Sequence, residues 1–444
     1  MWASPGFKQS EDTEIIERFT KLLEAYDIRA EIGARVDSHN AHSSPFGQEI
    51  VDIGPLSTKS LSIARKIRLA AYSAYSVEAL GERLSLLMHV SDASELTEII
   101  EHFQPRFLNW WENSAHKSLS DFQSELSVLW RGYNKHLMPA VAHFYGLTDQ
   151  QFGAPLIVHL MAHPLSVSQT NGNMVENHSV IEVLSGETAE NRVGVIIHEI
   201  AHYFFKSAPL TLHTKRLNGA LRARDPRASA ALGLMNEALA TAIGNGIVEQ
   251  GIREENFKAY FNRPRSFYLN QEIDTAAKTI LPLVTEYIAT SRTIDSEFLD
   301  QYYDLLFSSL GEELNSVSAR LRVSAYIATS TQLNNAAQGL PSLLGINSLY
   351  GSNLEENDTI EDAILTRHSY LNGFLLARKA DYQKLAAILP NAENLRVFHT
   401  DTVDSCIYRR DSAAVLYVIA INQQHLSSKE LKALIDRAKA CELN

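Results

Sequence analysis

Apolar residues recur at helical spacing through most of the first 150 residues. This periodicity predicts a helix over residues 12–26 and almost continuous helix from about Thr58 to Leu147. Residues 28–36 and 48–53 favour short strands instead. Residues 1–150 are therefore expected to form a mainly helical N-terminal lobe.

The pattern changes at Gly153. Two short runs that favour β-structure, Ala154–Met161 and Ser179–Leu184, flank a segment rich in Ser, Asn, Gln and Gly. This arrangement predicts a strand, a polar turn and a second strand. An apolar helix is expected to begin near Glu187–Asn191, and another, rich in Ala and Gly, to run from Ala230 to about Glu249. These elements would form the core of the protein, at residues 151–300.

Helical periodicity dominates again from Asp274 to about Leu389. The remaining residues predict a strand over Leu395–His399, a strand over Ala413–Ile421 and a helix over Ser428–Lys439. Residues 301–444 are therefore expected to form a helical C-terminal lobe that ends in a small strand-strand-helix unit. The fold expected for the whole chain is α+β and predominantly helical, with a small sheet in the core.

The chain of 444 residues is acidic, with a formal net charge of −12. Nucleic acids and anionic membranes usually require a basic face, so neither is an expected partner. Five basic residues do lie between Lys215 and Arg227, but Asp225 and Pro226 interrupt them. A solvated surface loop is the interpretation favoured for that segment.

No apolar run approaches the roughly 18–20 residues that a membrane-spanning helix requires. The first residues lack the basic start and apolar stretch of a signal peptide. We therefore expect a soluble protein, cytoplasmic unless the chain is the mature form of an exported one. The two cysteines, Cys406 and Cys441, leave a reduced pair and a single disulfide open as alternatives. No feature of the sequence indicates an oligomeric state.

The most informative residues are His198-Glu199-Ile200-Ala201-His202, in a strongly apolar helix. Residues four apart lie above one another on a helix face, so the two imidazoles can bind one metal ion. Glu199 lies about 100° around the helix from His198 and can reach an open coordination position. The alternative is three ordinary polar side chains on a half-exposed face. The apolar flanks argue against it, because buried polar groups need partners.

A catalytic zinc usually has three protein ligands and one water. The candidate for the third ligand is Glu237, because the small residues around it would let its helix approach the first one closely. The alternative is a glutamate on a helix surface. His159 and His163 also lie at short spacing, but we interpret them as ordinary polar residues. The sequence has no Gly-rich phosphate loop and no G-x-S-x-G motif, which excludes nucleotide-binding and serine-hydrolase sites of those types.

His198-Glu199-x-x-His202 followed by Asn236-Glu237-x-x-Ala240 resembles the gluzincin zinc metallopeptidases, the group that contains thermolysin and the aminopeptidases related to leukotriene hydrolase. The resemblance covers roughly residues 153–250. It implies a zincin-like catalytic core with one Zn²⁺ per chain on His198, His202 and Glu237. It also implies that Glu199 is the general base and that an edge strand, expected at Ser179–Leu184, holds the substrate extended.

This sequence departs from thermolysin in two places. The spacing between His202 and Glu237 is longer, and the Lys215–Arg227 segment is expected to supply the extra length. Thr241 stands where thermolysin has an Asp one turn after its glutamate ligand. The Gly-rich amine-recognition motif of the aminopeptidases is absent as well. That absence favours an endopeptidase, or a peptidase of unknown preference.

The resemblance predicts a zinc-dependent peptidase whose partner is a peptide or protein substrate. Gluzincins stabilise the oxyanion with a Tyr or His, for which Tyr302, Tyr303 and His213 are candidates. Tyr303 is selected by its rough distance along the chain, against the alternative that each tyrosine only packs in the core. Two further hypotheses remain open: a zincin-fold hydrolase of a non-peptide substrate, and a zinc-binding scaffold without catalysis. The presence of Glu199 weighs against the scaffold.

Overall fold

The structure is a computed structural model that describes residues 12–26, 63–148, 155–162, 172–344 and most of 346–442. The strands expected at 28–36 and 48–53, and His163, lie outside the described residues. In the described part, helix predominates and the longer strands form two sheets, which confirms an α+β and mostly helical fold. No helix within these ranges is both long and apolar enough to cross a membrane.

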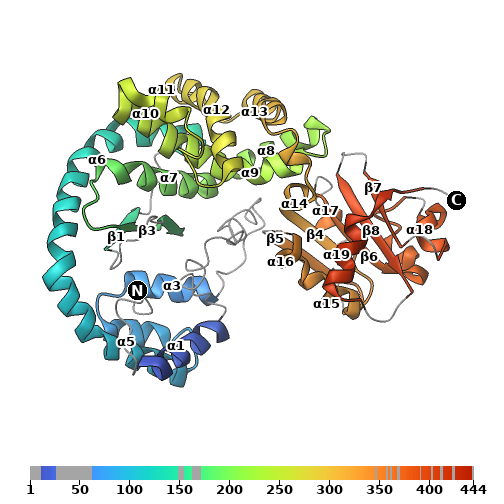
Figure 1. The fold of residues 1–444 in the computed structure, drawn as a ribbon, viewed down its shortest axis with the longest axis horizontal. Coiled ribbons are helices and arrows are strands. Elements are labelled where there is room, and N and C mark those ends of the chain that lie inside the picture. Colours follow the sequence, from blue (N-terminus) through green and yellow to red (C-terminus); the bar gives the residue numbers. More distant parts are fainter. Residues whose placement is uncertain are drawn as a thin grey trace.

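Helices build the N-terminal part of the molecule, as its periodicity predicts. They are α1 (Thr13–Ala25), α3 (Ile63–Ser73), α4 (Val77–Leu84), α5 (Val90–Trp110) and α6 (His116–Phe144). A small apolar core of its own joins α1, α3, α4 and α5. In Figure 1, α6 runs along one side of the molecule from these helices to the central ones. A π-helical turn, Trp111–Ala115, links α5 to α6.

A three-stranded sheet follows, with β1 (Ile157–Ala162), β2 (Gly172–Val175) and β3 (His178–Val183). The strand β3 is central, parallel to β1 and antiparallel to β2. The expectation that residues 179–184 form the edge strand is therefore wrong, because β3 lies between β1 and β2, the two outer strands of the described sheet. The residues of β2 belong to the segment predicted as a polar turn. A short edge strand pairs on one side only, so it does not need the continuous apolar run of a central strand.

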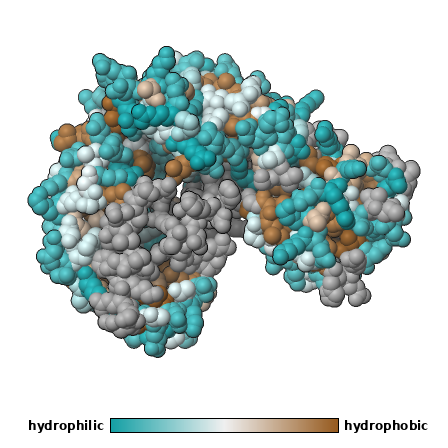
Figure 2. All heavy atoms as spheres, in the orientation of Figure 1, coloured by the Kyte–Doolittle hydropathy of each residue, from teal (hydrophilic) through white to brown (hydrophobic). Residues whose placement is uncertain are grey.

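The central helices are α7 (Glu190–Ser207), α8 (Leu210–Ala223), α9 (Ala228–Thr241), α10 (Val248–Arg253), α11 (Phe257–Phe261), α12 (Gln271–Ala289) and α13 (Ser296–Ser309), with a π-helix, η5 (Ala242–Ile247), between α9 and α10. Both predicted apolar helices are confirmed, the first as α7 and the second as α9, η5 and α10. On the face shown in Figure 2, the surface of this region is mainly hydrophilic. The apolar sides of these helices face one another in a single core.

The basic stretch from Lys215 to Arg227 is not a surface loop. It begins inside α8, which continues to Ala223 and buries Leu212, Arg216 and Ala220 along one side. Those buried positions are four residues apart, which is the period of a helix face. The segment was interpreted as a loop because its many charged residues make this helical period hard to recognise in the sequence.

The C-terminal part is built on a six-stranded sheet in the order β5-β4-β6-β8-β7-β9. Its strands are β4 (Val323–Ala328), β5 (Ser348–Asn353), β6 (Gly373–Arg378), β7 (Ser405–Arg409), β8 (Val415–Ile421) and β9 (Lys439–Ala440). The expectation of a helical lobe over residues 301–444 is therefore wrong. The four strands β5, β4, β6 and β8 run parallel. Buried parallel strands have short apolar runs that periodicity alone does not separate from buried helix.

Helices lie around this sheet, among them α15 (Thr331–Gln338), α16 (Leu340–Leu344) and α19 (Ser428–Asp436). The predicted strand at Ala413–Ile421 and the helix that follows it are confirmed as β8 and α19. Leu395–His399 is not a strand, because Arg396–His399 forms a helical turn, α18, that buries Val397 and Phe398. Cys406 in β7 forms a disulfide with Cys441, which follows β9. Of the two alternatives that the sequence left open, a reduced pair and a disulfide, the structure has the disulfide.

Candidate metal centre

Helix α7 is the buried element that carries the H-E-x-x-H residues. It contacts α6, α9, η5 and the small sheet, and its apolar residues belong to the main core. His198, Glu199 and His202 are all buried, at 6%, 7% and 3% exposure. The prediction that these polar residues lie inside the protein is confirmed. Polar groups buried to this degree require partners.

His198, His202 and Glu237 converge on one point. The Nε2 atoms of the two imidazoles are 3.0 Å apart, and the Glu237 carboxylate lies 3.5 Å from His198 Nε2 and 3.3 Å from His202 Nε2. Two ligand atoms at roughly 2.0–2.1 Å from one tetrahedral zinc are roughly 3.3–3.4 Å apart. The observed separations are close to that spacing, so the two Nε2 atoms and the carboxylate are spaced as the ligands of one zinc ion would be.

The charges of the three side chains also fit a divalent cation. Burial holds the pKa of His198 well below its usual range, and the proximity of His202 lowers it further, while the carbonyl of Ala240 opposes the shift. Neutral imidazole is the form that binds a metal. Glu237 is 5% exposed, and its Oε2 accepts no hydrogen bond from the described residues. A carboxylate buried in this way calls for a cation.

Asn236 orients one of the two imidazoles. Its side-chain oxygen lies 3.0 Å from His202 Nδ1 and accepts a hydrogen bond from it. With its proton on Nδ1, His202 presents the lone pair of Nε2 toward His198 and Glu237. Partners of this kind fix the tautomer of a metal-binding histidine. The resemblance to thermolysin pointed to Thr241 as the position for a partner of a histidine, whereas the residue in contact with His202 is Asn236, directly before Glu237.

Two glycines let α7 and η5 touch at the level of His198. A Cβ atom added to Gly244 would lie 2.4 Å from the carbonyl oxygen of Gly194 and 2.7 Å from the Cβ of His198. A Cβ on Gly194 would lie 2.8 Å from the carbonyl oxygen of Gly244. Neither position can accept a side chain without movement of the backbone. The contact fixes the distance between the helix that bears the histidines and the segment that continues from Glu237.

Glu199 lies against the edge strand of the small sheet. A Cβ atom on Gly172, the first residue of β2, would lie 2.5 Å from Glu199 Oε1. The cluster whose ligand atoms lie within 4.8 Å of one another contains His198, His202 and Glu237, and Glu199 is not a member of it. The glutamate of the motif therefore lies against β2 and outside the cluster of three. The absence of a side chain at Gly172 leaves room for its carboxylate.

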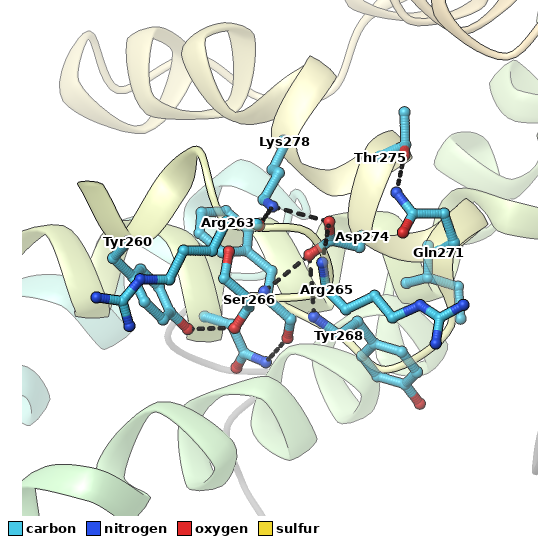
Figure 3. A network of polar contacts seen from close by, with 12 residues as sticks. Tyr260, Arg263, Arg265, Ser266, Tyr268, Gln271, Asp274, Thr275 and Lys278 are labelled. Carbon is cyan, nitrogen blue, oxygen red and sulfur yellow. Dashed lines mark hydrogen bonds and ion pairs between the residues drawn. The ribbon is translucent and has the colours of Figure 1, made fainter. Parts of the chain in front are cut away.

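A tyrosine that the sequence did not indicate, Tyr268, lies beside His198. The two rings stack with centroids 6.1 Å apart and planes inclined by 25°. Tyr268 belongs to the segment 262–270, between α11 and α12. Figure 3 shows its side chain directed away from the polar network around Asp274, with the hydroxyl at the far end.

Asp274 holds the segment that carries Tyr268. Its carboxylate, on α12, accepts hydrogen bonds from the backbone N–H groups of Arg265 at 3.1 Å, Phe267 at 2.8 Å and Tyr268 at 3.3 Å (Figure 3). Lys278 donates to the same carboxylate at 2.8 Å. Asp274 is 1% exposed. This buried side chain therefore fixes three backbone N–H groups of the segment, the one of Tyr268 included.

The π-helix η5 also holds this segment. Asn245 donates a side-chain hydrogen bond to the carbonyl of Phe267, whose ring packs against Gly246. Asn245 directly follows Gly244, the residue in contact with His198. The three residues Gly244 to Gly246 thus position both the histidine helix and the tyrosine segment.

The other candidates for oxyanion stabilisation lie in a different part of the core. The Tyr302 hydroxyl donates to the carbonyl of Ala231 at 2.7 Å, and burial raises its pKa well above the usual range. Tyr303 packs against Gly219 and Phe307. His213 Nδ1 accepts a hydrogen bond from the guanidinium of Arg216. These contacts account for the burial of the three residues without reference to a metal.

His159 pairs with a histidine on the neighbouring strand. Its Nε2 lies 2.8 Å from His178 Nδ1, and the two rings stack with centroids 5.1 Å apart. The ring of Tyr72 covers both of them. Burial lowers the pKa of His159, and the proximity of His178 lowers it further. This pair joins β1 to β3 and brings the N-terminal helix α3 against the sheet.

Comparison of the chain with models of protein families, with curated proteins and with solved structures finds no match. The case for a function therefore depends on the geometry of the site.

Proposed function

We propose that this protein is a zinc-dependent peptidase with a zincin-like core. The observation that supports it most strongly is the convergence of His198, His202 and Glu237 at the separations of a tetrahedral zinc site, with a buried glutamate beside them that is not a ligand. A zinc ion in such a site lowers the pKa of a bound water to roughly 7 and polarises a carbonyl group.

Glu199 would act as the general base. Its carboxylate lies against β2, and Glu199 directly follows His198 on α7, so a peptide bound along this edge strand would pass close to the carboxylate. Glu199 would accept a proton from the attacking water and then transfer it to the leaving amine. A zinc site with a purely structural role would have no use for a buried carboxylate in this position.

The edge strand favours a peptide over other substrates. The strand β2 pairs with β3 on one side, and a Cβ atom at its Gly172 would lie 2.5 Å from Glu199 Oε1. An extended peptide can add to such an edge through main-chain hydrogen bonds. The substrate backbone would then pass beside the general base, which gives the antiparallel strand β2 the role first expected of residues 179–184.

Tyr268 would supply the second donor to the oxyanion, in place of Tyr303. A hydrogen-bond donor that is already aimed at the developing charge contributes most when it needs no rearrangement. Asp274 and Asn245 both hold the Tyr268 segment, and the ring stacks on a ligand histidine. Tyr303 instead packs in a closed part of the core.

The decisive experiment removes the basicity of Glu199 and leaves its shape. We expect Glu199→Gln to retain one zinc per chain and its thermal stability while losing peptide hydrolysis by at least about 10²-fold. The substrate is found first with a peptide library, with a chelator as the negative control. Glu190→Gln, at the exposed start of the same helix, should behave like the unmodified protein.

Two outcomes would overturn the proposal. If the zinc-loaded protein cleaves no peptide in a broad library, a non-peptide hydrolase or a zinc-binding scaffold becomes the better interpretation. If Glu199→Gln loses its zinc, Glu199 supports the metal and is not the base.

A further inference from the structure

A buried arginine on α8 forms no ion pair within the part of the chain that the structure describes. Arg216 is 2% exposed, and among the described residues no carboxylate forms an ion pair with it. Its guanidinium lies over the ring of Phe205, 3.8 Å from the ring centroid. Burial lowers the pKa of Arg216 to about 10, so the group still carries its positive charge at neutral pH. A buried charge is costly unless an opposite charge accompanies it.

Two buried donors in this region have no hydrogen-bond partner within the described ranges. Arg216 Nη1 is buried without a hydrogen-bond partner, and so is the hydroxyl of Tyr145, which is fully buried at the end of α6. His213 uses Nδ1 to accept from Arg216 Nη2, so the proton of a neutral His213 is on Nε2. The hydroxyls of Tyr145 and Tyr303 lie within electrostatic range of the guanidinium. Arg216 Nη1 and the Tyr145 hydroxyl are therefore both available to donate to an acceptor with negative charge.

We propose that Arg216 Nη1 and the Tyr145 hydroxyl bind a small monovalent anion, which is chloride under ordinary conditions. One negative charge balances the one guanidinium. A water molecule could accept the same hydrogen bonds, but it would leave the charge uncompensated. The site is enclosed, since Arg216, Tyr145 and Tyr303 are each at most 2% exposed. This enclosure favours a monatomic halide over a carboxylate or phosphate attached to a larger molecule.

Such an anion would be a structural ligand of the core. Tyr145 comes from the end of α6, Arg216 from α8 and Phe205 from the end of α7, and the Phe205 and Tyr145 rings are in edge contact, 6.1 Å apart. The bound halide would therefore join the long N-terminal helix to the helix that carries the histidines. It takes no part in the proposed hydrolysis.

Thermal unfolding tests this site without any assay of activity. The protein is dialysed into sodium gluconate, and gluconate is then replaced by chloride, bromide, acetate or sulfate at constant ionic strength. We expect chloride and bromide to raise the midpoint of unfolding saturably, by about 3 °C at 200 mM. Acetate and sulfate should have no such effect. Crystals grown in bromide should show anomalous scattering between Arg216 and Tyr145.

Variants assign the response to these residues. Arg216→Met should abolish the halide effect, and Tyr145→Phe should raise the half-saturating halide concentration by about tenfold, since it removes one hydrogen bond to a charged group. Arg222→Met is the control, because Arg222 lies exposed on the same helix and pairs with Asp300 at 2.7 Å. Its halide response should be unchanged. If Arg216→Met does not fold, Tyr145→Phe and the bromide crystals decide.

Several results would overturn the proposal. An equal rise with every sodium salt would show charge screening alone, and no rise at all would show an uncompensated arginine. A response to acetate as large as that to chloride would show a carboxylate site. Absence of a bromide peak at the two residues would contradict the location.

Discussion

The ring of Tyr268 stacks on the imidazole of His198, and the backbone N–H of the same tyrosine donates to Asp274. A residue 70 positions along the chain from a candidate metal ligand is thus held against it by a carboxylate on a third element. This relationship places one tyrosine ring directly beside the candidate metal site.

Removal of the Tyr268 hydroxyl should slow hydrolysis without loss of metal. Tyr268→Phe keeps the ring and its stacking on His198, so zinc content and stability should be retained. We expect kcat to fall by about 10²-fold or more, the effect of losing one oxyanion donor. Tyr303→Phe is the matched control and should alter kcat by less than about threefold. If Tyr303→Phe causes the loss and Tyr268→Phe does not, the choice of Tyr303 from the sequence is correct.

Glu237 should be essential for metal binding, in contrast to another buried glutamate further along the same segment. We expect Glu237→Gln to weaken zinc binding by at least about 10²-fold, because it replaces an anionic ligand by a neutral amide. Glu249→Gln should retain stoichiometric zinc, because Glu249 pairs with Arg253 on α10. Metal analysis after dialysis against a weak chelator measures both. Stoichiometric zinc in Glu237→Gln would remove this residue from the site.

The contact between α7 and η5 should be sensitive to a single methyl group. Gly244→Ala would place a Cβ atom 2.4 Å from the carbonyl oxygen of Gly194, and such overpacking typically costs about 1–3 kcal/mol of unfolding free energy. Gly251→Ala, on α10, meets no atom within 4 Å and should be neutral or stabilising by up to about 1 kcal/mol. Urea unfolding compares the two. Equal stability of both variants would show that the close approach is not required.

The histidine pair of the small sheet should make stability depend on pH. Folding lowers the pKa of His159, so the unfolded chain binds the proton more tightly. The stabilisation is therefore complete above the ordinary pKa of about 6.5 and is lost as the pH falls through the lowered pKa of the folded state. His159→Phe keeps the stacking on Tyr72 but cannot titrate.

The free energy of unfolding is measured between pH 8 and pH 5. As the pH falls over this range, it should decrease less steeply for His159→Phe than for the unmodified protein. His136→Gln, at an exposed position of α6, should leave the slope unchanged. Identical slopes for all three proteins would mean that the pair does not titrate in this range.

The sequence was sufficient for the parts of the site that lie within one helix. The i, i+4 spacing of His198 and His202 and the apolar residues around them predict a buried pair directly. Glu237 could be found because the Ala and Gly residues around it indicated close helix packing. Tyr268 had no such signal, since its position follows from Asp274 and Asn245, which act through contacts between separate elements.

The same distinction applies to the fold. Helices with a full amphipathic period, such as α1 and α7, were predicted correctly. The strand β6, Gly373–Arg378, reads Gly-Phe-Leu-Leu-Ala-Arg, and its Leu and Ala residues are good helix formers. It is a central strand because it pairs with β4 and β8 on either side. In β6, burial between strands that are distant in sequence outweighs the helix preference of its own residues.

The π-helix η5 makes the winding of one helix a determinant of the site. In η5 the backbone hydrogen bonds span five residues, whereas those of an α-helix span four. The turn that follows α9 therefore contains one extra residue. This turn lies between Glu237 and the residues that contact His198 and Phe267. If the same residues wound as a regular α-helix instead, every position beyond this turn would rotate by about 100°. Asn245 would then turn away from Phe267. A deletion of one residue would take up the extra residue of the wide turn and keep these directions. In this segment, the winding of the helix therefore matters as much as the identity of its side chains.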